Sequence, residues 1–183
     1  QLLHSRQNED LLSVETASRL ALLLTKPYKD NPEKISALAG QLSLRLTPGC
    51  SFVTYIVKLK TNVPISVLAR ELQKSLNCFL KNYHLQSFYV ITHDVYHVFH
   101  IMGNQTLSSI VISSIDQFFK KQFSPLGLFF ISRGKTVSGV EKVHSSYTSA
   151  VVTLQSSFFF PVGTLLTCED TDTASSVLDD LAD

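Results

Sequence analysis

The stretch "SFYVITHDVYHVFHIMG" (Ser87–Gly103) says most about the fold of this chain. Its two halves are rich in Phe, Tyr, Val and Ile, which is typical of β-strands. Thr92, His93 and Asp94 interrupt the apolar run at the point where a tight turn would reverse the chain. The sequence therefore predicts an antiparallel hairpin with its turn at residues 92–96.

Three histidines in this stretch, His93, His97 and His100, raise the question of a metal site. Side chains on a strand alternate between the two faces, so His97 and His100 should point in opposite directions. The predicted turn separates His93 from His97, and no cysteine lies nearby in the sequence. We therefore expect ordinary hairpin histidines, with no metal or cofactor. A Ser-His-Asp triad built on His93 and Asp94 lacks the GxSxG pattern that exposes a nucleophilic serine.

Helices alternate with strands on both sides of the hairpin, which implies an α/β sheet with packed helices. Before the hairpin we expect a strand at Ser51–Lys60 and a helix from Pro64. After it we expect a helix capped by Thr106, a strand at Gly127–Ser132, a helix opened by a capping box of Ser138 and Glu141, a strand at Val162–Cys168, and a truncated helix capped by Thr171 or Thr173.

Two further helices are expected ahead of the sheet. Apolar residues at helical spacing predict the first over residues 9–25, and Pro27 ends it. Asn31-Pro32-Glu33 has the pattern of an N-cap, a proline at the first helical position and an acid in the first turn. The first helix either packs on its own sheet or pairs with a second chain. We expect it to contribute a dimer contact through Leu11, Leu12, Leu20 and Leu24.

Composition narrows the class of protein. The chain has 183 residues, 44% of them hydrophobic, which is enough to bury one real core. Its formal net charge of +1 is far below that of domains that bind nucleic acid or another polyanion, so we do not expect this function. Three widely spaced cysteines suggest reduced thiols in a cytoplasmic protein. The longest apolar runs are too short to span a bilayer, so we expect no membrane contact. The start without Met and the ending "LDDLAD" suggest a piece of a longer protein.

The predicted order of elements is similar to the nucleotidyl-cyclase palm of the GGDEF diguanylate cyclases. This resemblance implies an α+β sandwich with a mainly antiparallel sheet and packed helices, here preceded by N-terminal helices. In that family the hairpin turn carries glycines and a metal-binding acid, and a second acid ends the first strand. Here the two places are occupied by Thr92-His93-Asp94-Val95-Tyr96 and Val57-Lys58-Leu59-Lys60. Since two-metal phosphoryl chemistry needs carboxylates, the resemblance implies a relict hairpin turn without catalysis.

Three segments follow the course of a narrower group. They are "LALLLTKP", the run "ISALAGQLSLRLTPGCSFVTYIVKL", and "LFFISRGKTVSGVEKVHSSYTSAVVTLQSSFFFPVGTLL". Together, over Leu11 to Thr167, they resemble the degenerate GGDEF-like middle domains of YesN-type transcription regulators in the AraC family. The positions that match in the last segment are Ser146, Tyr147, Ala150, Phe158, Phe159 and Gly163.

This second resemblance implies a division of the chain and a role. Residues 1–47 would be N-terminal linker helices, 48–170 a degenerate GGDEF-like domain, and 171–183 the start of a C-terminal linker helix. The domain would be a non-catalytic, dimeric coupling module between a receiver domain or membrane sensor and a DNA-binding region elsewhere in the full protein. The alternatives are a divergent nucleotide cyclase, a nucleotide-binding domain associated with a phosphodiesterase, or a small-ligand sensor that uses the sheet face. The sequence names no ligand.

Overall fold

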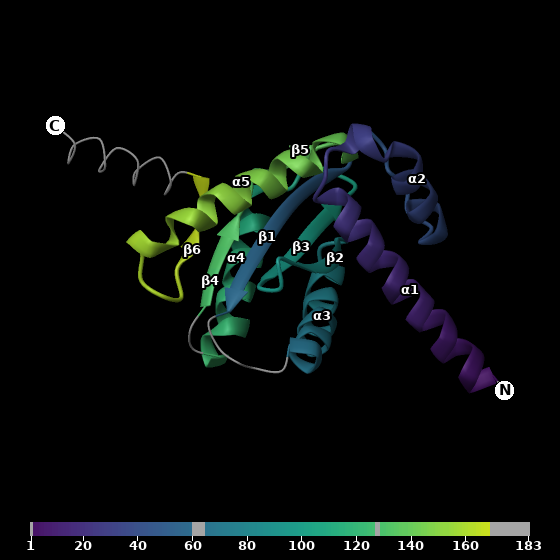
Figure 1. The fold of residues 1–183 in the computed structure, drawn as a ribbon, viewed down its shortest axis with the longest axis horizontal. Coiled ribbons are helices and arrows are strands. Elements are labelled where there is room, and N and C mark those ends of the chain that lie inside the picture. Colours follow the sequence, from purple (N-terminus) through teal and green to yellow (C-terminus); the bar gives the residue numbers. More distant parts are fainter. Residues whose placement is uncertain (1, 60–64, 127–128, 169–183) are drawn as a thin grey trace.

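A mostly antiparallel sheet with helices on both faces forms the body of the protein (Figure 1). The computed structural model describes residues 2–59, 65–126 and 129–168. Within these residues the elements are α1 (Leu2–Leu24), α2 (Pro32–Gln41), β1 (Ser51–Leu59), α3 (Ile65–Lys81), β2 (Gln86–Thr92), β3 (Tyr96–Gly103), α4 (Ser109–Phe123), β4 (Phe129–Arg133), β5 (Val137–Ser138), α5 (Val143–Gln155) and β6 (Leu165–Leu166).

The predicted hairpin is confirmed. β2 and β3 pair antiparallel from Gln86 opposite Met102 to Thr92 opposite Tyr96. His93 and Asp94 have φ values of 52° and 60°, and the N–H of Val95 donates to the carbonyl of Thr92 at 3.3 Å. Positive φ at both central positions is the signature of a type I′ turn, whose twist matches that of the flanking strands.

The strands lie in the order β2-β3-β1-β4-β6, with β5 beside the start of β1. β1 is central because it pairs antiparallel with β3 on one side and with β4 and β5 on the other. The last strand, β6, runs parallel to β4. The expected class, a mainly antiparallel sheet with packed helices, is therefore confirmed at this level.

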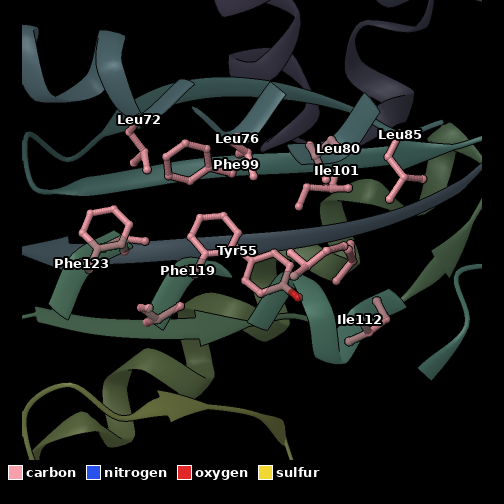
Figure 2. Close-up of a cluster of buried hydrophobic side chains, with 14 of the residues drawn as sticks. Tyr55, Leu72, Leu76, Leu80, Leu85, Phe99, Ile101, Ile112, Phe119 and Phe123 are labelled. Atoms are coloured by element: carbon pink, nitrogen blue, oxygen red, sulfur yellow. The ribbon is translucent and has the colours of Figure 1, made fainter. Parts of the chain in front are cut away.

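Each face of the sheet has its own hydrophobic core. Alternation along β1 sends Tyr55 to one face and Phe52 and Ile56 to the other. Figure 2 shows the first core, where α3 and α4 cover the sheet and the ring of Tyr55 stacks on Phe119 at a centroid distance of 4.6 Å. The second core is closed by α5, α2 and the C-terminal end of α1. Buried side chains fill both faces, so the described residues offer no open sheet face for a small ligand.

Two predicted helix caps are wrong. Ser108, and not Thr106, caps α4: its side chain accepts from the N–H of Val111 at 3.3 Å. The expected capping box at Ser138 does not form, because Ser138 belongs to β5. It pairs there with Ser51, in the part of β1 that β4 leaves unpaired. A 3-10 turn (Val140–Lys142) then leads into α5. This short β5 adds a sixth strand to the five that were expected.

The other element bounds differ only in extent. α1 begins at Leu2, because residues 2–8 contain no glycine or proline to stop it. Pro32 does open α2, but the side chain of its N-cap, Asn31, makes no capping hydrogen bond. The expected strand at 162–168 shrinks to the two residues of β6. The predictions for Lys60, Pro64, Gly127 and residues 171–183 fall outside the described residues.

Candidate functional site

The relict turn lies at the tip of the β2–β3 hairpin. His93, Asp94 and Val95 are exposed, and the ring of Tyr96 meets that of His93 edge-on at 5.8 Å. The Thr92 hydroxyl lies 3.4 Å from the hydroxyl of Tyr147 on α5. In the part of the chain that the structure describes, no three His, Cys, Asp or Glu side chains gather as they do around a metal ion.

His97 and His100 point to opposite faces of the sheet, as strand alternation predicts. His97 lies on the face of the first core, where its Nδ1 is 2.7 Å from the hydroxyl of Tyr89. Burial lowers the pKa of His97 and raises the pKa of Tyr89. Both groups are therefore neutral at pH 7, and they form a hydrogen-bonded pair with no charge to attract an anion.

His100, on the other face, caps the end of α1. Its Nε2 lies 3.0 Å from the carbonyl oxygen of Ala21, while the N–H of Thr25 bonds to the carbonyl of Leu22 instead. A carbonyl only accepts, so Nε2 carries the proton and Nδ1 accepts from the Thr54 hydroxyl at 2.9 Å. Complete burial lowers the pKa of His100 to about 4, although the bond to Ala21 favours the protonated form.

Thr54 continues this chain of hydrogen bonds to α5. β4 pairs with β1 only as far as Tyr55, and β5 reaches only Phe52, so the backbone of Thr54 faces a gap in the ladder. The Ser146 hydroxyl fills the gap by accepting from the Thr54 N–H at 3.0 Å, and the Gly134 N–H donates to the Thr54 carbonyl at 2.8 Å. At Gly134 a Cβ would overlap the backbone oxygen of Ser146, so only glycine allows this approach.

The first two turns of α5 thus connect several parts of the fold. We call the side chains of His144, Ser146, Tyr147 and Ser149 the α5 hub. They contact the segment after α1 (His144 Nδ1 donates to the carbonyl of Thr25, 2.9 Å), β1 (Ser146 with Thr54), the hairpin turn (Tyr147 with Thr92) and the β4–β5 connection (the Lys135 N–H donates to Ser149, 2.9 Å). The start of α5 is therefore hydrogen-bonded to the end of the α1 region, to the central strand, to the hairpin turn and to the β4–β5 connection.

The four leucines expected at a dimer contact do not share one open face. Leu20 and Leu24 are 1% and 3% exposed and belong to the second core of their own chain. Leu11 and Leu12 are 65% and 63% exposed on the N-terminal half of α1. Only Leu11 and Leu12 of the four are open to contact with a second chain.

A second polar cluster, which sequence reasoning missed, fixes α4 to the sheet. The Tyr55 hydroxyl donates to Asp116 at 2.6 Å, and Arg133 forms an ion pair with the same carboxylate. Burial and, after it, Asp116 raise the pKa of Tyr55. Burial alone would lower the pKa of Arg133, but Asp116 outweighs this effect and raises it. The guanidinium of Arg133 is therefore committed to a structural contact.

The sequence held partial signals for these residues. Ser146 and Tyr147 belong to the segment that resembles the regulator domains, and Thr54 and His100 are polar residues at inward positions of apolar strands. The hydrogen bonds between them could not be predicted from the sequence, since these depend on the gap between β4 and β5.

Every helix described is too short or too polar to serve as a membrane span. No protein-family model matches the chain, and a comparison with curated proteins finds no match.

Proposed function

We propose that this chain is a non-catalytic coupling domain of a bacterial transcription regulator, of the YesN type in the AraC family. It acts in the cytoplasm as a dimer, and it transmits a signal from the side of α1 to the side of α5. DNA is contacted by a region outside this chain, in keeping with the net charge of +1. The order of elements, similar to the GGDEF palm, supports this proposal.

One observation carries the proposal: the end of α1 is tied to α5 by buried hydrogen bonds. The route runs from the Ala21 carbonyl through His100 and Thr54 to Ser146. A second bond, from His144 to Thr25, joins α5 directly to the residue that follows α1. A change in the docking of α1 must break or remake these bonds, because a buried polar group left unpaired costs about 1–3 kcal/mol.

A divergent cyclase is the weaker reading of the same fold. Asp94 is the single acid of the hairpin turn, and Lys58 stands near the end of β1 where that chemistry needs a second acid. The turn also contains no glycine, whereas the cyclase family has glycines there that let a nucleotide approach the backbone. No specific observation favours the cyclase.

Amide hydrogen exchange tests the coupling. Leu24→Ala loosens the end of α1 in the second core, and Leu76→Ala, the matched control, removes an equally buried leucine from the first core. Each should lower the free energy of unfolding by about 2–5 kcal/mol. If α1 and α5 are coupled, Leu24→Ala speeds exchange in residues 143–149 far more than Leu76→Ala does.

Equal effects of the two variants on α5 would refute the coupling. Where alanine unfolds the protein, Leu24→Val and Leu76→Val provide the same comparison with a smaller perturbation. Dilute protein is used for these measurements, so that the result does not depend on association between chains.

A further inference from the structure

The edge strand β2 lacks the features by which natural sheets protect their edges. β2 is the terminal strand of the sheet and pairs only with β3 in the described residues. Its sequence, QSFYVIT, contains no charged residue and no proline, and its register with β3 runs without a bulge from Gln86 to Thr92. Charges, prolines and bulges are the usual means of preventing an edge strand from pairing with another chain. This edge is therefore open to strand addition.

The exposed half of α1 lies on the same side of the molecule. α1 packs against β2, and its N-terminal half then extends past that edge of the sheet (Figure 1). Large apolar side chains on this half are exposed: Leu3 (78%), Leu11 (65%), Leu12 (63%) and Val14 (60%). An isolated helix of this length is marginal in water, so a contact that buries these apolar side chains would stabilise it.

We infer that two copies of this chain associate by antiparallel pairing of β2 with β2, and that the exposed half of each α1 covers the junction. The inference rests on the proposed dimeric module and names its contact surface. One occupant, a second copy, accounts for both features, since the open edge and the exposed leucines are neighbours and a single two-fold association buries both.

The side chains of β2 suit this self-pairing. A two-fold axis at Tyr89 places Phe88 opposite Val90 of the second copy, Ser87 opposite Ile91, and Gln86 opposite Thr92. Each pair joins residues that lie on the same face of the sheet, so each hydrophobic core continues into its counterpart. No like charges meet in this register, because β2 carries none.

Sedimentation over a range of concentrations tests the inference on the whole chain. Ile91 is 37% exposed on β2, so Ile91→Lys places a charge at the junction. The expected result is at least an about tenfold rise in the dimer dissociation constant. Ile110→Lys is the matched control, because Ile110 is an aliphatic residue 77% exposed on α4, and it should leave the dissociation constant unchanged. Leu11→Asp with Leu12→Asp should weaken the dimer as Ile91→Lys does.

Hydrogen exchange gives a direct readout of the strand pairing. Alternate amides of residues 86–92, those directed away from β3, should gain protection as the protein concentration rises. If circular dichroism shows that Ile91→Lys perturbs folding, Gln86→Lys provides the same test, since Gln86 is exposed at the start of the strand.

Three results would overturn the inference. They are a wild-type chain that stays monomeric at the highest concentration, a dimer weakened only by the changes in α1, and open-ended polymers in place of dimers. None of these touches the comparison of Leu24 with Leu76 in dilute protein, so the coupling function and the contact surface can fail separately.

Discussion

His93 and Asp94 occupy left-handed backbone conformations that cost non-glycine residues roughly 1–2 kcal/mol each. Aspartate tolerates this region better than most residues, which explains how the turn forms without glycine. The hairpin is stable because β2 and β3 are held by the rest of the sheet, so the turn sequence is free to depart from the favoured Asn-Gly or Asp-Gly.

Asp94→Gly should therefore stabilise the protein. Glycine removes the penalty of the positive φ, and we expect the free energy of unfolding in urea to rise by about 0.5–1 kcal/mol. Asp94→Ala is the control, because it keeps a Cβ and should give no gain. A stability that falls in Asp94→Gly would mean that the carboxylate makes a stabilising contact in the turn.

His100 makes the stability depend on pH. Its pKa is lowered to about 4 in the folded protein, against 6.5 as the ordinary value. Above pH 6.5 the imidazole is neutral in both states, and its full contribution to stability is present. As the pH falls below about 6.5, His100 binds a proton in the unfolded chain but stays neutral in the folded protein. The free energy of unfolding should then drop by about 2 kcal/mol between about pH 7.5 and about pH 5.

His97, with its pKa also lowered by burial, acts in the same direction. Urea titrations at several pH values measure the effect, with NMR of the imidazole protons to assign it. A flat profile over this range, or an imidazole of His100 that titrates at its ordinary value in the folded protein, would show that the cap on α1 is solvated.

At the scale of the elements, α5 lies close against Gly134, the residue that follows β4. Gly134→Ala should cost about 1–3 kcal/mol, since the new methyl group meets the backbone of Ser146, which cannot move without lifting α5. Gly40→Ala is the matched control: a Cβ at Gly40 meets nothing within 4 Å, and α2 should gain about 0.5–1 kcal/mol. Thermal unfolding of the two variants should shift in opposite directions. A neutral Gly134→Ala would mean that α5 is held loosely.

Periodicity predicted the elements that bury many apolar side chains, and it failed where a few polar contacts decide the structure. β1, the hairpin and α4 were placed correctly because their apolar residues recur at strand or helical spacing. The start of α5 was misplaced because Ser138 has two competing roles, helix cap and strand residue, and only the free edge of β1 decides between them.

The site shows the same division. The turn at Thr92–Tyr96 was located from its sequence, and the opposite directions of His97 and His100 followed from strand alternation. The partners of His100 were not foreseeable, since Ala21, Thr54 and Ser146 are far apart in the sequence and meet only when both helices have docked.

At the scale of the whole molecule, the proposal predicts chemical silence. Purified protein should convert neither GTP nor ATP to a cyclic product, and Mg²⁺ or Mn²⁺ should not perturb the NMR signals of the hairpin, because one exposed carboxylate cannot hold two metal ions. Chromatography of the nucleotides measures the first point. Metal-dependent turnover that disappears in Asp94→Ala would restore the cyclase reading.

α1 and the last described strand lie at opposite edges of the sheet. α1 packs beside β2, while Cys168 follows β6 at the opposite end of the strand order. Four strand spacings separate these edges, roughly 19 Å at about 4.8 Å each. A segment that crossed the sheet from the β2 edge to the β6 edge would need at least about six extended residues. For the same reason, fluorescent labels attached to β2 and to β6 would lie on opposite flanks of the sheet, a fixed width apart.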